Sequence, residues 1–145
     1  MEEKSYYIAE VSNKGNENEK VVIKFYSNLT KNLRVHKVTS FLEKYPKSTN
    51  KNLKIANNLV SFLNYIQENI ECGKIKSLEF VTLEDCSNYL NKAKEHITHA
   101  DLNAQKRLFT KFMYFLAKNQ MLIKVRKSDF KFDVKAGKDV LKIPF

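Results

Sequence analysis

Residues 101–123 read DLNAQKRLFTKFMYFLAKNQMLI, and this stretch decides the fold because its apolar residues recur at steps of three and four. That spacing predicts an amphipathic helix. Thr98 or Asp101 can cap its first turn, where an acidic residue also suits the helix dipole. We expect the helix to end after Asn119 and Gln120. Its apolar side comprises Leu102, Leu108, Phe109, Phe112, Met113, Phe115 and Leu116.

The opposite side of this helix is polar and cationic. Such a helix can pack on a core and still offer hydrogen-bond donors to phosphates. A solvated helix face is the alternative interpretation of the same stripe. The candidate binding residues on this side are Asn103, Lys106, Arg107, Thr110 and Lys111.

The charge of the chain is uneven along its length. The net charge is +10, of which residues 1–50 carry +3, residues 51–100 carry 0, and residues 101–145 carry +7. The last segment has eleven Lys and Arg against four Asp and Glu. A basic excess gathered in one region is typical of a polyanion-binding surface. An anionic membrane would suit the charge equally, but no Lys/Arg-rich helix here carries an isolated apolar side, so we expect no membrane partner.

Before the helix predicted in residues 101–123, which we call the organising helix, the sequence pattern predicts a β-hairpin and then further helices. Residues 5–12 and 20–27 are β-rich runs on either side of a polar loop. A third strand is needed to stabilise such a hairpin, and either Lys31–Val38 or the Phe130–Val134 tail can supply it. A short helix is expected over Val38–Tyr45, before Pro46.

A long helix is expected from about Asn52 to Cys72, with Ser48 or Thr49 as its cap and Gly73 as its stop. Its polar side is rich in Asn, which lowers helix propensity and suggests a use for the amides. General enrichment of the chain in Asn and Lys is the alternative explanation, and we favour it slightly. That side carries Lys51, Lys54, Asn57, Asn58, Ser61, Asn64 and Tyr65, of which the first five are candidate binding residues.

The next helix is expected to start at Thr82, with Asp85 completing a capping box. After the organising helix, the tail has short alternation and a basic cluster, Lys124, Arg126 and Lys127, and is expected to form a strand or linker. We expect three parts: residues 1–47 form an N-terminal hairpin and short helix, 48–125 a helical domain, and 126–145 a basic tail or an inter-domain linker.

Residues with catalytic or metal-binding chemistry are few. The spacings between Cys72, Cys86, His96 and His99 are not those of common zinc sites. Three glycines form no phosphate-binding loop. We therefore expect no metal, no cofactor and no catalytic residue, and two reduced cysteines. No apolar run is long enough to cross a bilayer, and the start MEEKSYYIAE is no signal peptide, so we expect a cytoplasmic protein.

Three segments together resemble the core-binding domain of tyrosine recombinases and phage integrases. They are SFLNYI at residues 61–66, SLEFVTLEDCSNYL at residues 77–90, and NAQKRLFTKFMYFLAKNQMLI at residues 103–123. The similarity covers about residues 48 to 123, and it implies that the helical domain expected at 48–125 is a core-binding domain. It implies a mainly α fold, a four- to five-helix SAM-like bundle preceded here by a small N-terminal β-hairpin or sheet.

The resemblance implies a duplex DNA-binding domain for site recognition in DNA integration or recombination, of bacterial or phage origin. The resemblance also implies self-association on DNA or contact with a downstream catalytic domain. This chain departs from the family where Gln120-Met121 stands in place of the usual Asn-Pro. It also lacks the His-x-x-Arg pair of the catalytic domain, since none of its three His precedes an Arg by three residues. The alternatives are a recombinase-derived phage or mobile-element regulator, such as a repressor, or a protein-interaction module without catalysis.

Overall fold

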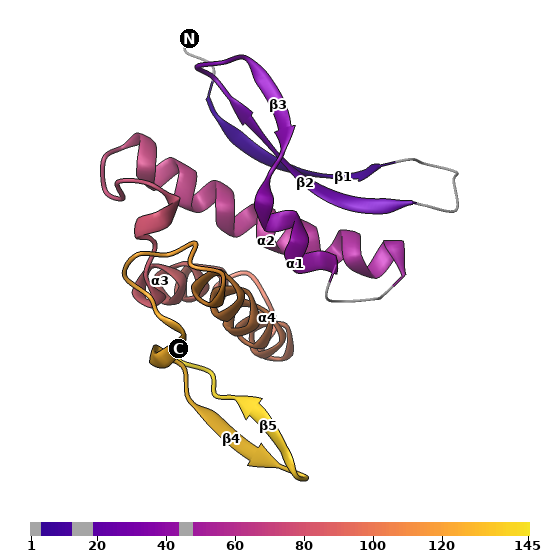
Figure 1. Cartoon of the computed structure of the whole chain (residues 1–145), viewed down its shortest axis with the longest axis vertical. Coiled ribbons are helices and arrows are strands. Elements are labelled where there is room, and N and C mark those ends of the chain that lie inside the picture. Colours follow the sequence, from indigo (N-terminus) through magenta and orange to yellow (C-terminus); the bar gives the residue numbers. More distant parts are fainter. Residues whose placement is uncertain (1–3, 13–18, 44–47) are drawn as a thin grey trace. The chain divides into compact units, whose positions relative to one another are not determined.

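The computed structural model describes residues 4–12, 19–43 and 48–145 (Figure 1). Two compact units divide the chain, Met1–Glu68 and Asn69–Phe145. Four α-helices and a three-stranded antiparallel sheet near the N-terminus make up most of the described residues. The expectation of a mainly helical chain with a small N-terminal sheet is thus confirmed.

The sheet of the first unit has the order β1-β2-β3. The strands are β1 (Tyr6–Ser12), β2 (Lys20–Ser27) and β3 (Asn32–Val35), and each pairs antiparallel with its neighbour. The predicted hairpin is confirmed, although residues 13–18 of its loop lie outside the described residues. Of the two candidates for a third strand, the segment at Lys31–Val38 is the one that pairs, over four residues.

The two faces of this sheet differ because side chains alternate along a strand. One face is buried and includes Tyr7, Val21 and Ile23. On the other face the ring of Tyr6 stacks on that of Tyr26, with 5.2 Å between centroids. Leu33 and Val35 of β3 are exposed on this same outer face.

Side chains from the following helical segments bind the backbone of the strands. The N–H of Tyr7 donates to Oδ1 of Asn64 at 2.7 Å, and Nδ2 of Asn64 donates to the Tyr7 carbonyl at 3.1 Å. The Thr39 hydroxyl accepts from the N–H of Ile23 and donates to its carbonyl, each at 3.0 Å. These bonds satisfy strand groups that have no partner strand. The side chain of Asn64 is therefore bonded to the backbone of β1, whereas the helical periodicity predicted that it would face outward.

A 3₁₀ turn at Lys37–Thr39 leads into the short helix α1 (Ser40–Glu43). His36 caps the turn, because its Nδ1 accepts from the N–H of Val38 at 3.2 Å. The predicted helix over Val38–Tyr45 is confirmed as far as Glu43, and residues 44–47 are outside the described part. Phe41 and Leu42 are buried.

Helix α2 (Thr49–Glu71) begins three residues earlier than expected. Ser48 is its cap, since its hydroxyl accepts from the N–H of Lys51 at 3.4 Å. Gly73 ends it with φ +82°, and the paired bonds from Gly73 N–H to the Ile70 carbonyl and from Lys74 N–H to the Asn69 carbonyl form a Schellman motif. The buried side comprises Ala56, Leu59, Phe62, Leu63 and Ile66.

The second unit contains α3 (Leu83–Ala93) and α4 (His99–Lys118). Thr82 and Asp85 form the predicted capping box of α3. Thr98, rather than Asp101, caps α4, since its hydroxyl accepts from the N–H of Asp101. A second Schellman motif ends α4, and here the residue at positive φ is Gln120, at +57°.

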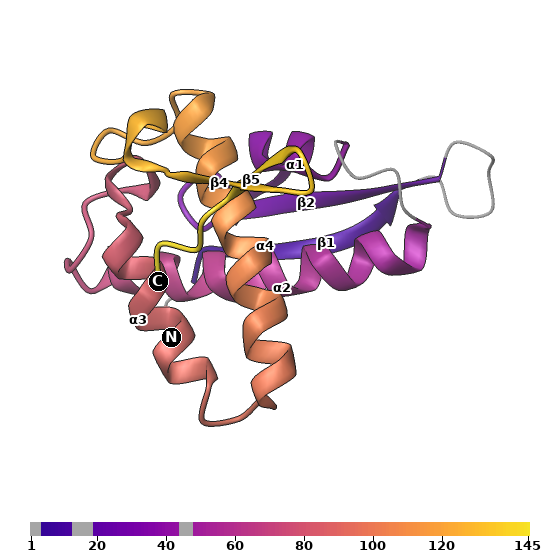
Figure 2. The ribbon, with the colours of Figure 1, turned by 90° about the horizontal axis from the view of Figure 1, so that it is seen from below.

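The tail forms a second hairpin, which Figure 2 shows beside α4. After a 3₁₀ turn at Lys127–Asp129 come β4 (Phe132–Lys135) and β5 (Lys138–Leu141). The sequence predicted a strand or linker in this region, and the second strand was not foreseen. No helix in the described ranges is long and apolar enough to cross a membrane.

Candidate functional site

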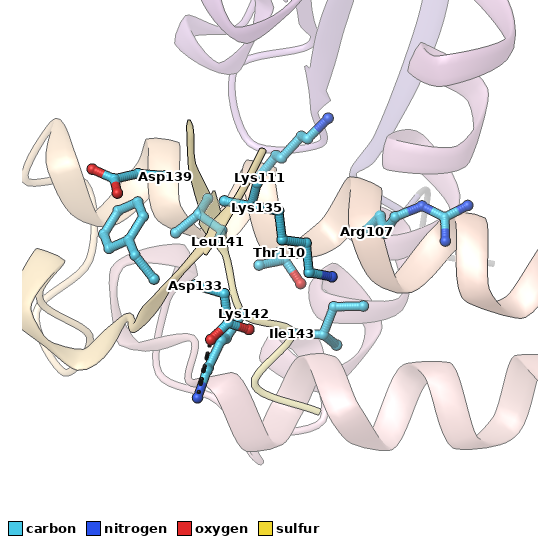
Figure 3. Close-up of a pocket in the computed structure, with 11 residues that line it drawn as sticks. Arg107, Thr110, Lys111, Asp133, Lys135, Asp139, Leu141, Lys142 and Ile143 are labelled. Atoms are coloured by element: carbon cyan, nitrogen blue, oxygen red, sulfur yellow. Dashed lines mark ion pairs between the residues drawn. The ribbon is translucent and has the colours of Figure 1, made fainter. Parts of the chain in front are cut away.

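A hollow of about 690 Å³ lies between helix α4 and the β4–β5 hairpin (Figure 3). Four cationic side chains and two carboxylates line it together with aliphatic and aromatic groups. The lining residues are Arg107, Thr110, Lys111, Phe132, Asp133, Lys135, Asp139, Val140, Leu141, Lys142 and Ile143.

Local sequence explains why the hairpin forms. Ala136 and Gly137 join the two strands, and both have positive φ, +51° and +75°. A two-residue loop with both residues at positive φ is a type I′ turn, whose twist matches that of antiparallel strands. The turn sets the register, with Lys135 directly opposite Lys138 and Phe132 opposite Leu141.

Aromatic contacts hold the hairpin on α4. The ring of Tyr114 meets Phe130 at 5.3 Å and Phe132 at 5.8 Å between centroids, both edge to face. Such pairs add about 0.5–1.5 kcal/mol each beyond the area they bury. A lone two-stranded hairpin is marginal in water, so this packing is what allows β4 and β5 to persist.

Strand alternation gives the hairpin two different faces. The odd-numbered residues of β4 lie on the same face as the even-numbered residues of β5, as the register requires. Figure 3 shows Asp133 and Lys142 joined on this side of the hairpin, in an ion pair of 3.3 Å. We call this the lysine face, and its residues are Lys131, Asp133, Lys135, Lys138, Val140 and Lys142. The reverse side carries Phe132, Val134, Asp139 and Leu141.

Helix α4 contributes Arg107, Thr110 and Lys111 to the hollow. Arg107 and Lys111 are exposed, as their place on the polar side predicts. Thr110 is different: only 2% of it is exposed, and its hydroxyl donates to the Lys106 carbonyl at 2.6 Å. The polar stripe of the sequence predicted an outward-facing Thr110, and this prediction is wrong because the fold buries the side chain. Its hydroxyl is occupied within the helix and is a poor donor to an outside ligand.

The other candidate residues do not line the hollow. On α4, the side chains of Asn103 and Lys106 are half-buried. On α2, the exposed candidates are Lys51, Lys54, Asn57 and Ser61, while Asn58 is half-buried. The hydroxyl of Ser61 donates to the Asn57 carbonyl at 3.2 Å, one turn back in the helix.

Two cations of the hollow, Lys135 and Lys142, were missed in the sequence. The signal was present in VKAGKDV at residues 134–140, where a small residue and Gly separate two alternating runs. Asn-Gly or Asp-Gly would have predicted the hairpin directly, whereas Ala-Gly is a weaker indication.

The electrostatic balance of the hollow favours an anion. Arg107, Lys111, Lys135 and Lys142 outnumber the two carboxylates, and the Asp133 carboxylate is already paired with Lys142. The cations are exposed, so their attraction for a single small ion is weakened by solvent. A ligand with several negative charges gains most from such a set, because it meets several cations at once.

Thiol and metal chemistry have little support in the described part of the chain. Cys86 is buried, and burial raises the pKa of its thiol, so it acts as a small core residue. Cys72 is exposed, and neither cysteine is in a disulfide. Among the described residues no three His, Cys, Asp or Glu side chains come together in a way that would hold a metal ion.

Comparison with protein-family models, with curated proteins and with solved structures gives no match to this chain.

Proposed function

We propose that this chain is a duplex DNA-binding module, of the kind that the core-binding domain of tyrosine recombinases provides for site recognition. Its helical part would then be a SAM-like bundle, acting without catalysis of its own. The observation that carries the proposal is the hollow beside α4, where four cations from two different elements line one surface.

Charge supports a polyanion as the ligand. Residues 101–145 hold eleven Lys and Arg against four Asp and Glu, and this segment supplies every residue of the hollow. Duplex DNA presents a regular row of phosphates, and each contacted phosphate releases counterions. Scattered exposed cations that bind one small anion weakly therefore bind a nucleic acid well.

The test is fluorescence anisotropy with a labelled random-sequence duplex at several salt concentrations. Wild-type protein should bind with an affinity that falls steeply as salt rises. Replacing Arg107 and Lys111 together by Ala should weaken binding, and should lower the log–log salt slope by about 1.8 if both contact phosphates. The melting temperature should hardly change, because both side chains are exposed.

A matched control is the double change of Lys94 and Lys118 to Ala. Both lysines are exposed on helix ends of the same unit and neither lines the hollow, so the same net charge is removed elsewhere. This control should keep the wild-type slope apart from a small general effect. Indifference of the wild-type protein to duplex DNA at low salt would rule the proposal out.

A protein-interaction module is the second candidate, and one observation favours it. The outer face of the N-terminal sheet exposes apolar side chains, including Tyr6 at 41%, Leu33 at 40% and Val35 at 57%. Grouped exposed apolar residues often mark a protein contact. This candidate gains if the wild-type protein shows no salt-dependent DNA binding.

A further inference from the structure

Two features destabilise the tip of the β4–β5 hairpin, and no contact within the hairpin compensates for them. Lys135 and Lys138 are directly opposed across the two strands, on either side of the turn. Like charges in this position destabilise a hairpin, since the two Cβ atoms lie only about 4.5–5.5 Å apart. Within the described part of the chain, neither ammonium forms an ion pair with a carboxylate.

The second cost is in the backbone of the same turn. Ala136 has φ +51°, a left-handed conformation that Asn, Asp or Gly adopts more readily. Strained backbone tends to gather at functional positions, where something outside the local fold compensates for it. All four residues of the tip, from Lys135 to Lys138, are exposed.

The two nearby carboxylates, Asp133 and Asp139, do not neutralise the lysines of the tip. Asp133 lies on the lysine face but pairs with Lys142, and Asp139 belongs to the reverse side by strand alternation. Figure 3 shows Asp139 and Lys135 on different sides of the hairpin. The lysine face therefore has four cations against one carboxylate, and the ion pair of that carboxylate with Lys142 leaves three cations in excess.

From these observations we infer that Lys135 and Lys138 form a clamp for backbone phosphates of duplex DNA. The inference rests on the proposed function and names the hairpin as a contacting element of its surface. A phosphate between the two ammonium groups removes their mutual repulsion, and two-stranded ribbons are narrow enough to lie along a DNA groove. The contact is to the sugar–phosphate backbone, so it carries no preference for base sequence.

The experiment compares Lys135→Gln/Lys138→Gln with wild-type protein on two duplexes of unrelated sequence. The variant should bind both duplexes more weakly by the same factor. Its log–log salt slope should be smaller by about 0.9 to about 1.8, the values expected when one or two phosphates are no longer neutralised by the protein. Its melting temperature without DNA should be equal to or higher than that of the wild type, because the opposed charges are gone.

Two further variants serve as controls. Lys94→Gln/Lys118→Gln removes the same charge from helix ends of the same unit and should retain the wild-type slope. Lys135→Arg/Lys138→Arg keeps both cations at the tip and should retain the wild-type affinity.

The clamp is refuted if the tip variant binds with wild-type affinity and slope, or if the control loses as much slope as the tip variant. A difference between the two duplexes would equally refute it, since it would indicate base contacts. If the wild-type protein itself shows no salt-dependent binding, the proposed function fails, which is a separate and distinguishable result.

Discussion

Replacement of Asn64 by Ala should destabilise the first unit because two hydrogen bonds can no longer form. The Asn64 carboxamide accepts from the Tyr7 N–H at 2.7 Å and donates to the Tyr7 carbonyl at 3.1 Å. A net hydrogen bond is worth about 0.5–1.5 kcal/mol, and a buried group left without a partner costs about 1–3 kcal/mol. Tyr7 is buried, so water reaches its backbone poorly after the change.

The helix itself gains from the same substitution. Ala has a higher helix propensity than Asn, by about 0.5 kcal/mol, and this offsets part of the loss. Two bonds at about 1 kcal/mol each, plus about 1 kcal/mol for a Tyr7 group left without a partner and less the gain in propensity, give a net loss of about 2.5 kcal/mol. Urea denaturation followed by circular dichroism measures it through the midpoint, provided that the slope of the transition is unchanged.

Asn57→Ala is the matched control for this prediction. Asn57 is exposed on the same helix, whereas Asn64 is half-buried and bonded to the strand backbone. The control should therefore show only the gain in propensity, about 0.5 kcal/mol or less. If both variants unfold within about 0.5 kcal/mol of each other, the reasoning about Asn64 is wrong.

Two further predictions concern His36 and Gln120. Burial, and then the charge of Lys37, lowers the pKa of His36, so below pH of about 6.5 the unfolded chain takes up a proton that the folded chain resists. Stability should therefore fall as pH is lowered from 7.5 towards 5, and His36→Asn, which keeps a capping acceptor for the Val38 N–H, should show a smaller fall in urea midpoint. Gln120→Gly should raise the free energy of unfolding by about 1 kcal/mol, because Gln120 sits at φ +57° where glycine has no steric cost. Asn119→Gly, at φ −92°, should instead lower it, and a gain for both variants would contradict the argument from φ.

The helices of this protein were predictable because their signals are local. The spacing of apolar residues in 101–123 predicted α4, and the Thr82/Asp85 pair predicted the start of α3, both within a few residues of the observed bounds. A cap needs only a side chain three residues from the N–H that it binds, so the sequence contains the whole interaction. Gly73 as the end of α2 was predictable for the same reason.

The hairpin of the tail was less predictable, because its turn uses Ala136 where Asn or Asp would have been a clear signal. Its stability also depends on Tyr114, which lies outside the hairpin and belongs to α4. Sequence reasoning therefore identified Arg107 and Lys111 but not Lys135 and Lys142, which come to the same hollow only through this packing.

Amino-acid order by itself determined where the helices begin and end, which side of each is apolar, and that positive charge gathers after residue 100. Tertiary structure alone decided which polar side chains are available to a ligand. Asn64 and Thr110 both belong to polar stripes in the sequence, yet one binds the backbone of a strand and the other is buried against its own helix. The physical reason is that hydrogen-bonding groups are satisfied by whatever the fold brings within reach, and periodicity along one helix carries no information about its neighbours.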